Sequence, residues 1–344
     1  MGMNILTKKI RINALCNSSP CARYRIQAPG ILLNRDPEIE FRFFDHISND
    51  NVAHFINEAD IAIFQRVAYS PTLKYLYDEL RARETTIVFE IDDALTMLPE
   101  NSSFKTSLRE SYEEEIKDAI KNADVVQCST HALAQLYSPI NPKCMVLENQ
   151  LTHPKKPRQV LPQPHDTLVI GYGAAEHHYW DWMSIHTGIK KVVEKLENLE
   201  IPFEIWMIGD PDIQEAVPTK RIKRFPVSPF DKYLQLVQCF DVALMPLEDN
   251  PFNRCKSDIK YLEASSLGVA CLASSVAYSN AVRHNETGLL YDTEEEFVEN
   301  LMQLINNPEL RNRLGKNAYD CVWKHRELSQ HIATWANFYR TLVL

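Results

Sequence analysis

The stretch "DVALMPLEDNPFNRCKSDIKYLEASSLGVACLAS", residues 241–274, predicts a buried strand, a polar loop, a helix and a second buried strand. The two outer runs are short and almost wholly apolar, as fully buried strands of a parallel sheet are. Ser257 is a good N-terminal cap and Gly268 lies where a helix would end, so the spacing predicts a helix over residues 258–267. Strand, helix and strand in this order form one unit of a doubly wound α/β sheet.

The same alternation of strand and helix patterns runs through both halves of the chain. In the first half, short β-rich runs alternate with amphipathic patterns such as residues 70–84, where Ser70 precedes a helix that Pro71 begins. Residues 149–166 then hold four prolines and no apolar periodicity, which is typical of a linker. The alternation restarts with "TLVIGYG" at residues 167–173. We therefore expect an α/β protein with two Rossmann-like, doubly wound domains that face each other across a cleft.

Length and composition are those of an ordinary globular protein. The 344 residues suggest about two domains, and the apolar and charged contents are 45% and 24%. A formal net charge of −9 argues against a nucleic-acid binder, which would normally carry a basic face. The N-terminus lacks the apolar core of a signal peptide, and no apolar run approaches the roughly 18 residues that a membrane span needs. We expect a cytoplasmic protein, with at most a peripheral association at the inner face of the membrane.

The cysteines predict neither a zinc site nor a disulfide framework. The eight cysteines form no CxxC pair and several lie in apolar runs, as Cys271 does in "VACLA". Cysteines in such runs behave as small buried apolar side chains in a reducing compartment. We therefore expect no metal site.

The polar loop after residue 247 predicts an anion site. In open α/β sheets, ligands bind beyond the carboxyl ends of the strands, where the positive end of the following helix also points. Arg254 and Lys256 add fixed positive charge there, which suits a polyphosphate. Glu263 lies further along the helix, where its carboxylate can accept two hydrogen bonds from a ribose diol. The alternative is that both cations are solvated and that Glu263 only pairs with Lys260 at i, i−3.

Residues 250–274 and 281–319, which include "NPFNRCKSDIKYLEASSLGVACLAS", resemble the C-terminal half of the group 1 (family 4) glycosyltransferases of GT-B fold. Upstream, "IGYGAAEHHYWDW" at residues 170–182 is similar to the opening of their second domain. "CARYRI" and "VFEIDDAL" are similar to motifs of a subgroup that carries "RYR" and "DIDD". The resemblance implies a retaining enzyme whose substrate is a nucleotide-diphosphate sugar and which needs neither metal nor cofactor.

The resemblance also implies roles for single residues. Arg254 and Lys256 match the basic pair that grips the donor diphosphate, and Ser257 and Asp258 stand beside them at the helix start. Glu263 matches the second glutamate of the E-x7-E pattern, which binds the ribose. The first glutamate of that pattern falls at Cys255 in this chain, which leaves the donor sugar open.

The glycine turn that opens the second half suggests further contacts. Gly171 and Gly173 form a GxG without the third glycine of a dinucleotide site, because Glu176 stands in its place. We expect these glycines to allow close approach of a sugar-phosphate. The polar and aromatic cluster that follows, which includes His177 and Tyr179, suits contact with a sugar on the acceptor side.

Two groups in the first half are candidates for the acceptor side. Asp92 and Asp93 end the apolar run "TIVFEI", so either carboxylate can orient an acceptor hydroxyl or take up its proton. Alternation along a strand would keep the two from pointing the same way, and a cap of the following turn is the alternative for Asp93. Arg23 and Arg25 follow the first strand and would contact the acceptor or the donor phosphates, unless Arg25 is an ordinary surface charge.

The domains follow from these assignments. Residues 1–150 form an acceptor-side domain, residues 151–166 a linker, residues 167–328 a nucleotide-sugar-binding domain, and residues 329–344 a last helix. Four residues form an apolar stripe on that helix: Ile332, Trp335, Tyr339 and Leu342. The resemblance implies that this stripe packs back on the first domain.

The expected function is metal-independent transfer of a sugar from a nucleotide diphosphate to a glycan, a lipid-linked sugar or a protein hydroxyl. One alternative is a sugar-nucleotide epimerase of the same fold. Another, motivated by Cys255, is a catalytically silent binding partner in a glycan-assembly complex. The sequence leaves the donor sugar and base, the acceptor, the linkage and the oligomeric state open.

Overall fold

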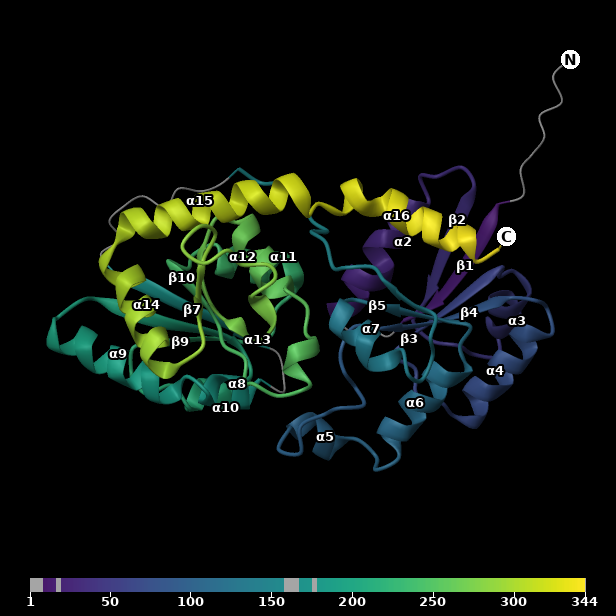
Figure 1. Cartoon of the computed structure of the whole chain (residues 1–344), viewed down its shortest axis with the longest axis horizontal. Coiled ribbons are helices and arrows are strands. Elements are labelled where there is room, and N and C mark those ends of the chain that lie inside the picture. Colours follow the sequence, from purple (N-terminus) through teal and green to yellow (C-terminus); the bar gives the residue numbers. More distant parts are fainter. Residues whose placement is uncertain (1–8, 17–19, 158–166, 175–177, 344) are drawn as a thin grey trace, which may run out of the picture.

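A computed structural model describes residues 9–16, 20–157, 167–174 and 178–343, without the side chains of residues 103 and 104. These residues form two α/β domains, each built on a six-stranded sheet in which all paired strands are parallel (Figure 1). The predicted fold class, with two doubly wound Rossmann-like domains, is confirmed.

The first sheet has the strand order β2-β1-β3-β4-β5-β6. Its strands are β1 (Ile10–Leu15), β2 (Ile39–Phe44), β3 (Ile61–Gln65), β4 (Thr86–Ile91), β5 (Val125–Cys128) and β6 (Cys144–Val146). The helices are α1 (Pro20–Ala22), the π-helical turn η1 (Arg23–Gln27), α2 (Ala28–Leu33), α3 (Val52–Asn57), α4 (Pro71–Arg81), α5 (Ser103–Ser107), α6 (Tyr112–Asn122) and α7 (His131–Tyr137). As predicted, Ser70 caps α4, because its side chain accepts a hydrogen bond from the backbone N–H of Leu73.

The second sheet has the strand order β12-β11-β10-β7-β8-β9. Its strands are β7 (Leu168–Ala174), β8 (Phe203–Gly209), β9 (Ile222–Phe225), β10 (Val242–Met245), β11 (Ala270–Ser274) and β12 (Leu289–Tyr291). The helices are α8 (Tyr179–Met183), α9 (His186–Asn198), α10 (Pro211–Glu215), α11 (Phe230–Val237), the 3₁₀ turn η2 (Asn253–Cys255), α12 (Ile259–Ser266), α13 (Ser275–Tyr278), α14 (Glu294–Asn306) and α15 (Pro308–His325).

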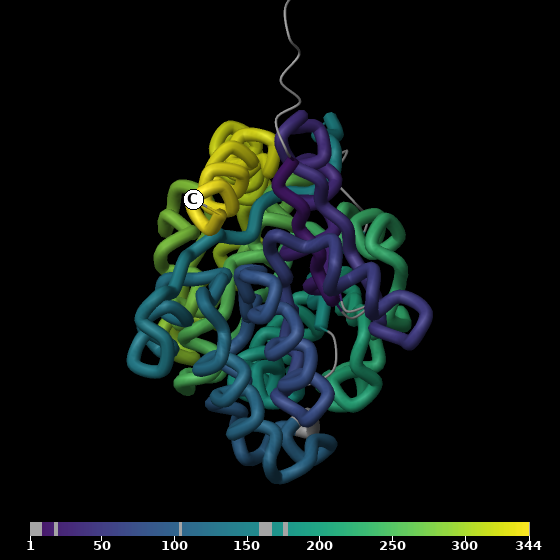
Figure 2. Tube along the Cα trace, turned by 90° about the vertical axis from the view of Figure 1, so that its right-hand side faces the viewer, coloured from purple at the N-terminus to yellow at the C-terminus, as the bar shows by residue number. Residues whose placement is uncertain are grey.

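The last helix, α16 (Leu328–Thr341), crosses from the second domain to the first. In Figure 1, α15 lies along the second domain and α16 continues over the first, and Figure 2 shows α16 in yellow along the upper side of the first domain. Trp335 and Tyr339 are buried in the apolar cluster of the first domain, with Ile332 and Leu342 partly buried against it. The stripe that the sequence showed on this helix therefore faces β1, β2 and α2.

A row of buried polar side chains lies in the sheet on the face that α16 covers. Gln65, Glu90 and Gln127 are in register across β3, β4 and β5, and each is at most 1% exposed. The Tyr339 hydroxyl donates to Gln127 Oε1 at 2.8 Å, and Arg25 Nε donates to Glu90 Oε1 at 2.6 Å. These bonds tie α16 and η1 to the middle of the first sheet.

The structure also bears on the expectations for the cysteines and for membrane-spanning helices. The eight cysteines are free, and Cys271 is buried as its apolar run predicted. In the part of the chain that the structure describes, no helix has the length and apolar character that crossing a membrane requires.

Candidate functional site

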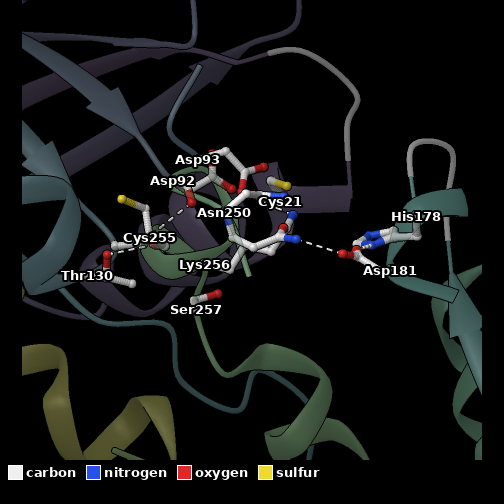
Figure 3. Close-up of polar contacts among 12 residues, drawn as sticks. Cys21, Asp92, Asp93, Thr130, His178, Asp181, Asn250, Cys255, Lys256 and Ser257 are labelled. Carbon is white, nitrogen blue, oxygen red and sulfur yellow. Dashed lines mark hydrogen bonds and ion pairs between the residues drawn. The ribbon is translucent and has the colours of Figure 1, made fainter. Parts of the chain in front are cut away.

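The candidate site lies where the strand order of each sheet reverses. In the second sheet, β10 and β7 are neighbours at the reversal, and in the first sheet β1 and β3 are. Ligands of open α/β sheets bind at these positions, beyond the carboxyl ends of the strands. Residues of both domains meet here. Lys256 Nζ of the second domain lies 3.7 Å from Asp93 Oδ1, which follows β4 of the first domain (Figure 3).

The start of α12 differs from the prediction by one residue. Asp258, not Ser257, holds the cap position, and its side chain makes no cap hydrogen bond. The Asp258 carboxylate pairs with Arg326 at 2.6 Å, and the Ser257 hydroxyl accepts from Asn149 Nδ2 at 2.9 Å. Both residues are thus used in contacts with the segments that connect the two domains, rather than in capping.

The ammonium group of Lys260 is buried in the site. Its Nζ is buried and finds no hydrogen-bond acceptor among the described residues, and it lies 5.1 Å from the ring centroid of Tyr172. Burial lowers the pKa of Lys260 to about 8, Lys256 adds to this effect, and Asp181 and Glu263 oppose it. A buried ammonium without a partner is costly, so this position indicates an anionic ligand.

The sequence analysis assigned Lys260 only to a pair with Glu263 and missed this role. The signal was present, because Lys256 and Lys260 are four residues apart at a helix start. Lys256 itself lies 4.5 Å from the ring centroid of Phe252 and faces Asp93.

Arg254 does not join this cluster. It lies in η2 with an exposed side chain, and its Nε and Nη2 donate to the two carboxylate oxygens of Asp249 at 2.6 and 2.8 Å. The structure therefore brings Lys256 and Lys260 together where the sequence predicted Arg254 and Lys256.

Glu263 is buried at the domain boundary and is bonded by two tyrosines. The Tyr24 hydroxyl, from η1 of the first domain, donates to Glu263 Oε1 at 2.5 Å. Burial raises the pKa of Glu263, against the hydrogen bonds from Tyr24 and Tyr233 that lower it. In this arrangement the first domain occupies one of the two oxygens that a ribose diol would use.

Cys255 is buried against the first domain. Its side chain is 8% exposed and packs in the apolar cluster of the first domain, where Phe252 is partly buried as well. The Cys255 carbonyl also accepts from Thr130 Oγ1 at 2.9 Å. The loop before α12 is thus seated in the first domain beside α7.

Asp92 and Asp93 share one cation. Arg66 Nε donates to Asp92, and Arg66 Nη2 donates to Asp93 Oδ2 at 2.6 Å. The expectation that the two carboxylates point apart is wrong, because β4 ends at Ile91 and the alternation of a strand ends with it. Burial alone would raise the pKa of Asp93, but Lys256 and Arg66 together hold that pKa below its ordinary value.

Arg66 is a site residue that the sequence analysis missed. Its backbone adopts φ 53°, a left-handed conformation that a residue with a side chain rarely takes. Backbone strain of this kind clusters at functional sites. The strain places the guanidinium between the two aspartates and within 3.5 Å of Cys21 Sγ.

The candidate residues that follow β7 have different surroundings. His177 lies outside the described residues. Tyr179 packs partly against the apolar cluster of the second domain and meets Trp180 edge to face, so it serves the core rather than the cluster of charges. The neighbouring His178 is bonded through Nδ1 to Asp181 at 2.6 Å. Lys256 and Lys260 both act to lower the pKa of His178.

Arg23 and Arg25 both contact residues that lie far away in the sequence. The Arg23 guanidinium lies 4.0 Å from the ring centroid of Phe230 in the second domain, and its Nε donates to Thr152. Arg25 is fully buried and bonds Glu90, Leu147 and Asn149. The alternative that Arg25 is an ordinary surface charge is wrong, because no part of it reaches the surface.

The two glycines of β7 make room for side chains of their own domain. A Cβ on Gly171 would lie 2.1 Å from the Phe240 ring, and one on Gly173 would lie 2.9 Å from the Tyr233 ring. Close approach of a sugar-phosphate is therefore not needed to explain Gly171.

Replacing Gly171 by alanine is expected to lower the free energy of unfolding of the second domain by about 1–3 kcal/mol, the usual cost of overpacking. Denaturant unfolding of wild type and variant, followed by circular dichroism, measures this loss. A second change, Phe240→Leu, should recover part of the loss. Unchanged stability together with weaker nucleotide binding would instead support the sugar-phosphate contact predicted from sequence.

The described residues contain no group of three His, Cys, Asp or Glu side chains arranged to hold a metal ion. The charged groups of the site are instead Lys256, Lys260, Arg66 and the two aspartates that Arg66 joins. Such an arrangement suits an anionic ligand between the domains.

Comparison with known proteins assigns this region to a class. Residues 175–307 match the family "Glycosyl transferases group 1". The match spans less than half of the chain and contains η2, α12 and both lysines. A stretch of 58 residues is 41% identical to "Glycosyltransferase 1 domain-containing protein 1" of Xenopus tropicalis, and it covers 17% of either protein. The chain thus spans about a sixth of the length of that relative.

Solved structures confirm the GT-B fold. Sucrose-phosphate synthase of Thermosynechococcus elongatus superposes with a TM-score of 0.68 at 13% identity, covering 97% of this chain and 99% of that chain. Anabaena HepE in complex with UDP and glucose superposes with a TM-score of 0.63 at 13% identity, covering 96% and 100%. These likenesses establish the architecture, and the family match supports a group 1 glycosyltransferase of this fold.

Proposed function

We propose that the protein transfers a glycosyl group from a nucleotide-diphosphate sugar, held by the second domain, to a hydroxyl of a glycan, lipid-linked or protein acceptor on the side of the first domain. The observation that carries this proposal is the buried ammonium of Lys260 at the start of α12, which has no hydrogen-bond partner among the described residues and lies within the segment that matches the group 1 glycosyl transferases.

The residues of the site suit this chemistry. As the bond to the anomeric carbon breaks, negative charge grows on the leaving diphosphate, and cations fixed beforehand stabilise it without reorganisation. Lys256, Lys260 and the first turn of α12 supply that positive charge. Asp93, held ionised by Lys256 and Arg66, is the acceptor-side carboxylate that can receive a hydroxyl hydrogen bond.

The test begins with binding and then measures transfer. A panel of nucleoside diphosphates and their sugars is screened by thermal shift, since a ligand of the folded state raises its apparent stability. The best donor is then incubated with acceptors of the three classes. No stabilisation by any nucleotide would contradict the proposal. A new sugar nucleotide formed from donor alone would indicate an epimerase, and binding without transfer or hydrolysis a silent partner.

Transfer is expected to proceed without a divalent cation, because protein cations stand at the proposed diphosphate position. Turnover measured after extensive dialysis against EDTA should match turnover with added Mg²⁺ or Mn²⁺. Loss of turnover in EDTA that either metal restores would show that the lysines do not suffice.

Replacing Tyr24 by phenylalanine is expected to strengthen nucleotide binding several-fold. The variant keeps the ring but frees Glu263 Oε1 from its bond to the first domain, so a ribose hydroxyl no longer competes with Tyr24. Calorimetric titration of both proteins with the best nucleotide measures the change. Tyr233→Phe is the matched control, because it removes the bond to Glu263 that comes from the same domain. Weaker binding to Tyr24→Phe would make the Tyr24 hydroxyl a ligand contact instead.

A further inference from the structure

His178 is held by a fixed carboxylate at the edge of the lysine cluster. Its Nδ1 lies 2.6 Å from Asp181 Oδ2, while Asp181 Oδ1 accepts from Asn253 Nδ2 at 2.6 Å and from the backbone N–H of Glu248 at 2.9 Å. Asp181 is 4% exposed, so the loop after β10 fixes its position. Figure 3 shows His178 and Asp181 opposite the loop that carries Asn250 and Lys256.

The hydrogen bonds decide which ring nitrogen carries the proton. Burial would raise the pKa of Asp181, but the hydrogen bond from His178 and the charges around it hold that pKa below its ordinary value. The carboxylate is therefore ionised and accepts from Nδ1–H of the neutral ring. Nε2 is left as the ring atom that can take up a second proton.

Charged groups from four segments face this imidazole. Lys260 lies in α12, Lys256 in the turn before it, Asp181 in α8, and Asp93 follows β4 of the first domain. Burial lowers the pKa of His178 to about 4, both lysines act in the same direction, and Asp181 opposes them. Without an anion the ring is thus neutral beside two cations, one of which has no hydrogen-bond partner among the described residues. A diphosphate placed against the lysines would reverse the electrostatic effect on the ring.

We propose that His178 is a third cation of the diphosphate site, which takes up one proton from solvent when the nucleotide binds and donates it as a hydrogen bond to a phosphate oxygen. The inference rests on the proposed function. One proton moves from the buffer to Nε2, Nδ1 stays bonded to Asp181, and no covalent bond to the ring forms. The protonated ring then faces the charge that the diphosphate gains as it leaves the sugar.

Calorimetry measures the proton directly. Wild type, His178→Gln and His186→Gln are titrated with UDP at pH 7 in two buffers of different ionisation enthalpy, because the difference in heat reports protons exchanged on binding. The terminal phosphate of UDP also titrates near about pH 6, so the informative quantity is the difference between wild type and variant. We expect wild type to take up about 0.5–1 proton more per UDP than His178→Gln. His186, at the start of α9 outside the cluster, should behave as wild type when replaced.

Affinity gives an independent readout. His178→Gln should bind UDP about 10-fold more weakly than wild type at pH 6, the loss of one charge-assisted hydrogen bond. The gap should close towards pH 9, where the ring of the wild type no longer holds the second proton. Equal proton uptake by wild type and variant, with UDP bound by both, contradicts the role of His178 and leaves the proposed function intact. A wild type that binds no nucleoside diphosphate of the panel contradicts the proposed function itself.

A measurement without substitution covers the case in which His178→Gln does not fold. Ring signals of the eleven histidines are recorded by NMR at pH 7 with and without saturating UDP. One histidine should change from the neutral to the protonated form when UDP is added. A spectrum in which none does so overturns the proposal.

Discussion

Replacing Lys260 by methionine should raise the free energy of unfolding and remove most nucleotide binding at the same time. Methionine fills nearly the same volume but leaves no buried ammonium. Because the pKa of Lys260 is lowered from 10.5 to about 8, the charged side chain costs the folded state on the order of 3 kcal/mol at neutral pH. The nucleotide meanwhile loses a charge-assisted hydrogen bond, which weakens binding by about 10- to 150-fold.

The stability gained in Lys260→Met should depend on pH. Between about pH 8 and 10.5 the unfolded chain binds more protons at this lysine than the folded chain does, so wild-type stability rises with pH through that window. Lys260→Met lacks this rise, and its advantage over wild type should disappear above about pH 10.5. Denaturant unfolding at pH 7 and pH 10 measures both effects.

Arg254→Ala is the matched control for Lys260→Met. Arg254 is a cation six residues away, exposed and paired with Asp249, so its removal should change nucleotide affinity by about twofold or less. A large loss of nucleotide affinity in Arg254→Ala with little loss in Lys260→Met would instead support the sequence prediction that Arg254 and Lys256 bind the donor diphosphate. The opposite result supports the cluster of Lys256 and Lys260.

Replacing Arg25 by alanine is expected to lower the free energy of unfolding of the first domain by about 3–5 kcal/mol, because it leaves Glu90 buried without its cation. Neither side chain of the pair has any exposed surface. The change also removes hydrogen bonds to Leu147 and Asn149. Denaturant unfolding of wild type and variant, followed by circular dichroism, measures the loss.

The loss of stability should grow with pH. Burial raises the pKa of Glu90 to about 7 even with Arg25 opposing it, and without Arg25 the pKa must be higher still. A carboxyl whose pKa is raised on folding loses stability as pH rises above its unfolded value, so the variant should be least stable above about pH 7 and recover towards pH 5. The double variant Arg25→Ala with Glu90→Gln should regain part of the loss. A loss of about 1 kcal/mol or less at pH 8 would mean that Glu90 is already neutral there.

The sequence predicted those features of the structure that depend on residues close together in the chain. The strands and the helices follow from periodicity and caps, which are local, and the structure differs at the start of α12 by one residue. The bond from Tyr24 to Glu263 joins residues 239 positions apart, and no local pattern indicates it. Arg66 was missed for the same reason, since its two aspartates are 26 and 27 residues away.

Two alternatives that the sequence left open have another origin. The spacing on a helix allows Lys260 to pair with Glu263, but Glu263 is bonded by tyrosines, and Lys260 Nζ has no hydrogen-bond partner among the described residues. For Arg25 the sequence left a ligand contact and a surface charge open, and full burial of an arginine is rare. The structure places Arg25 in η1 against Glu90, a member of the row of buried polar side chains that α16 covers.

The seating of Cys255 in the first domain couples the two domains at this residue. A glutamate at residue 255 would place a carboxylate in an apolar cluster of the other domain, where its burial without a partner is costly. The side chain at residue 255 and the first-domain residues around it therefore cannot be exchanged independently of each other.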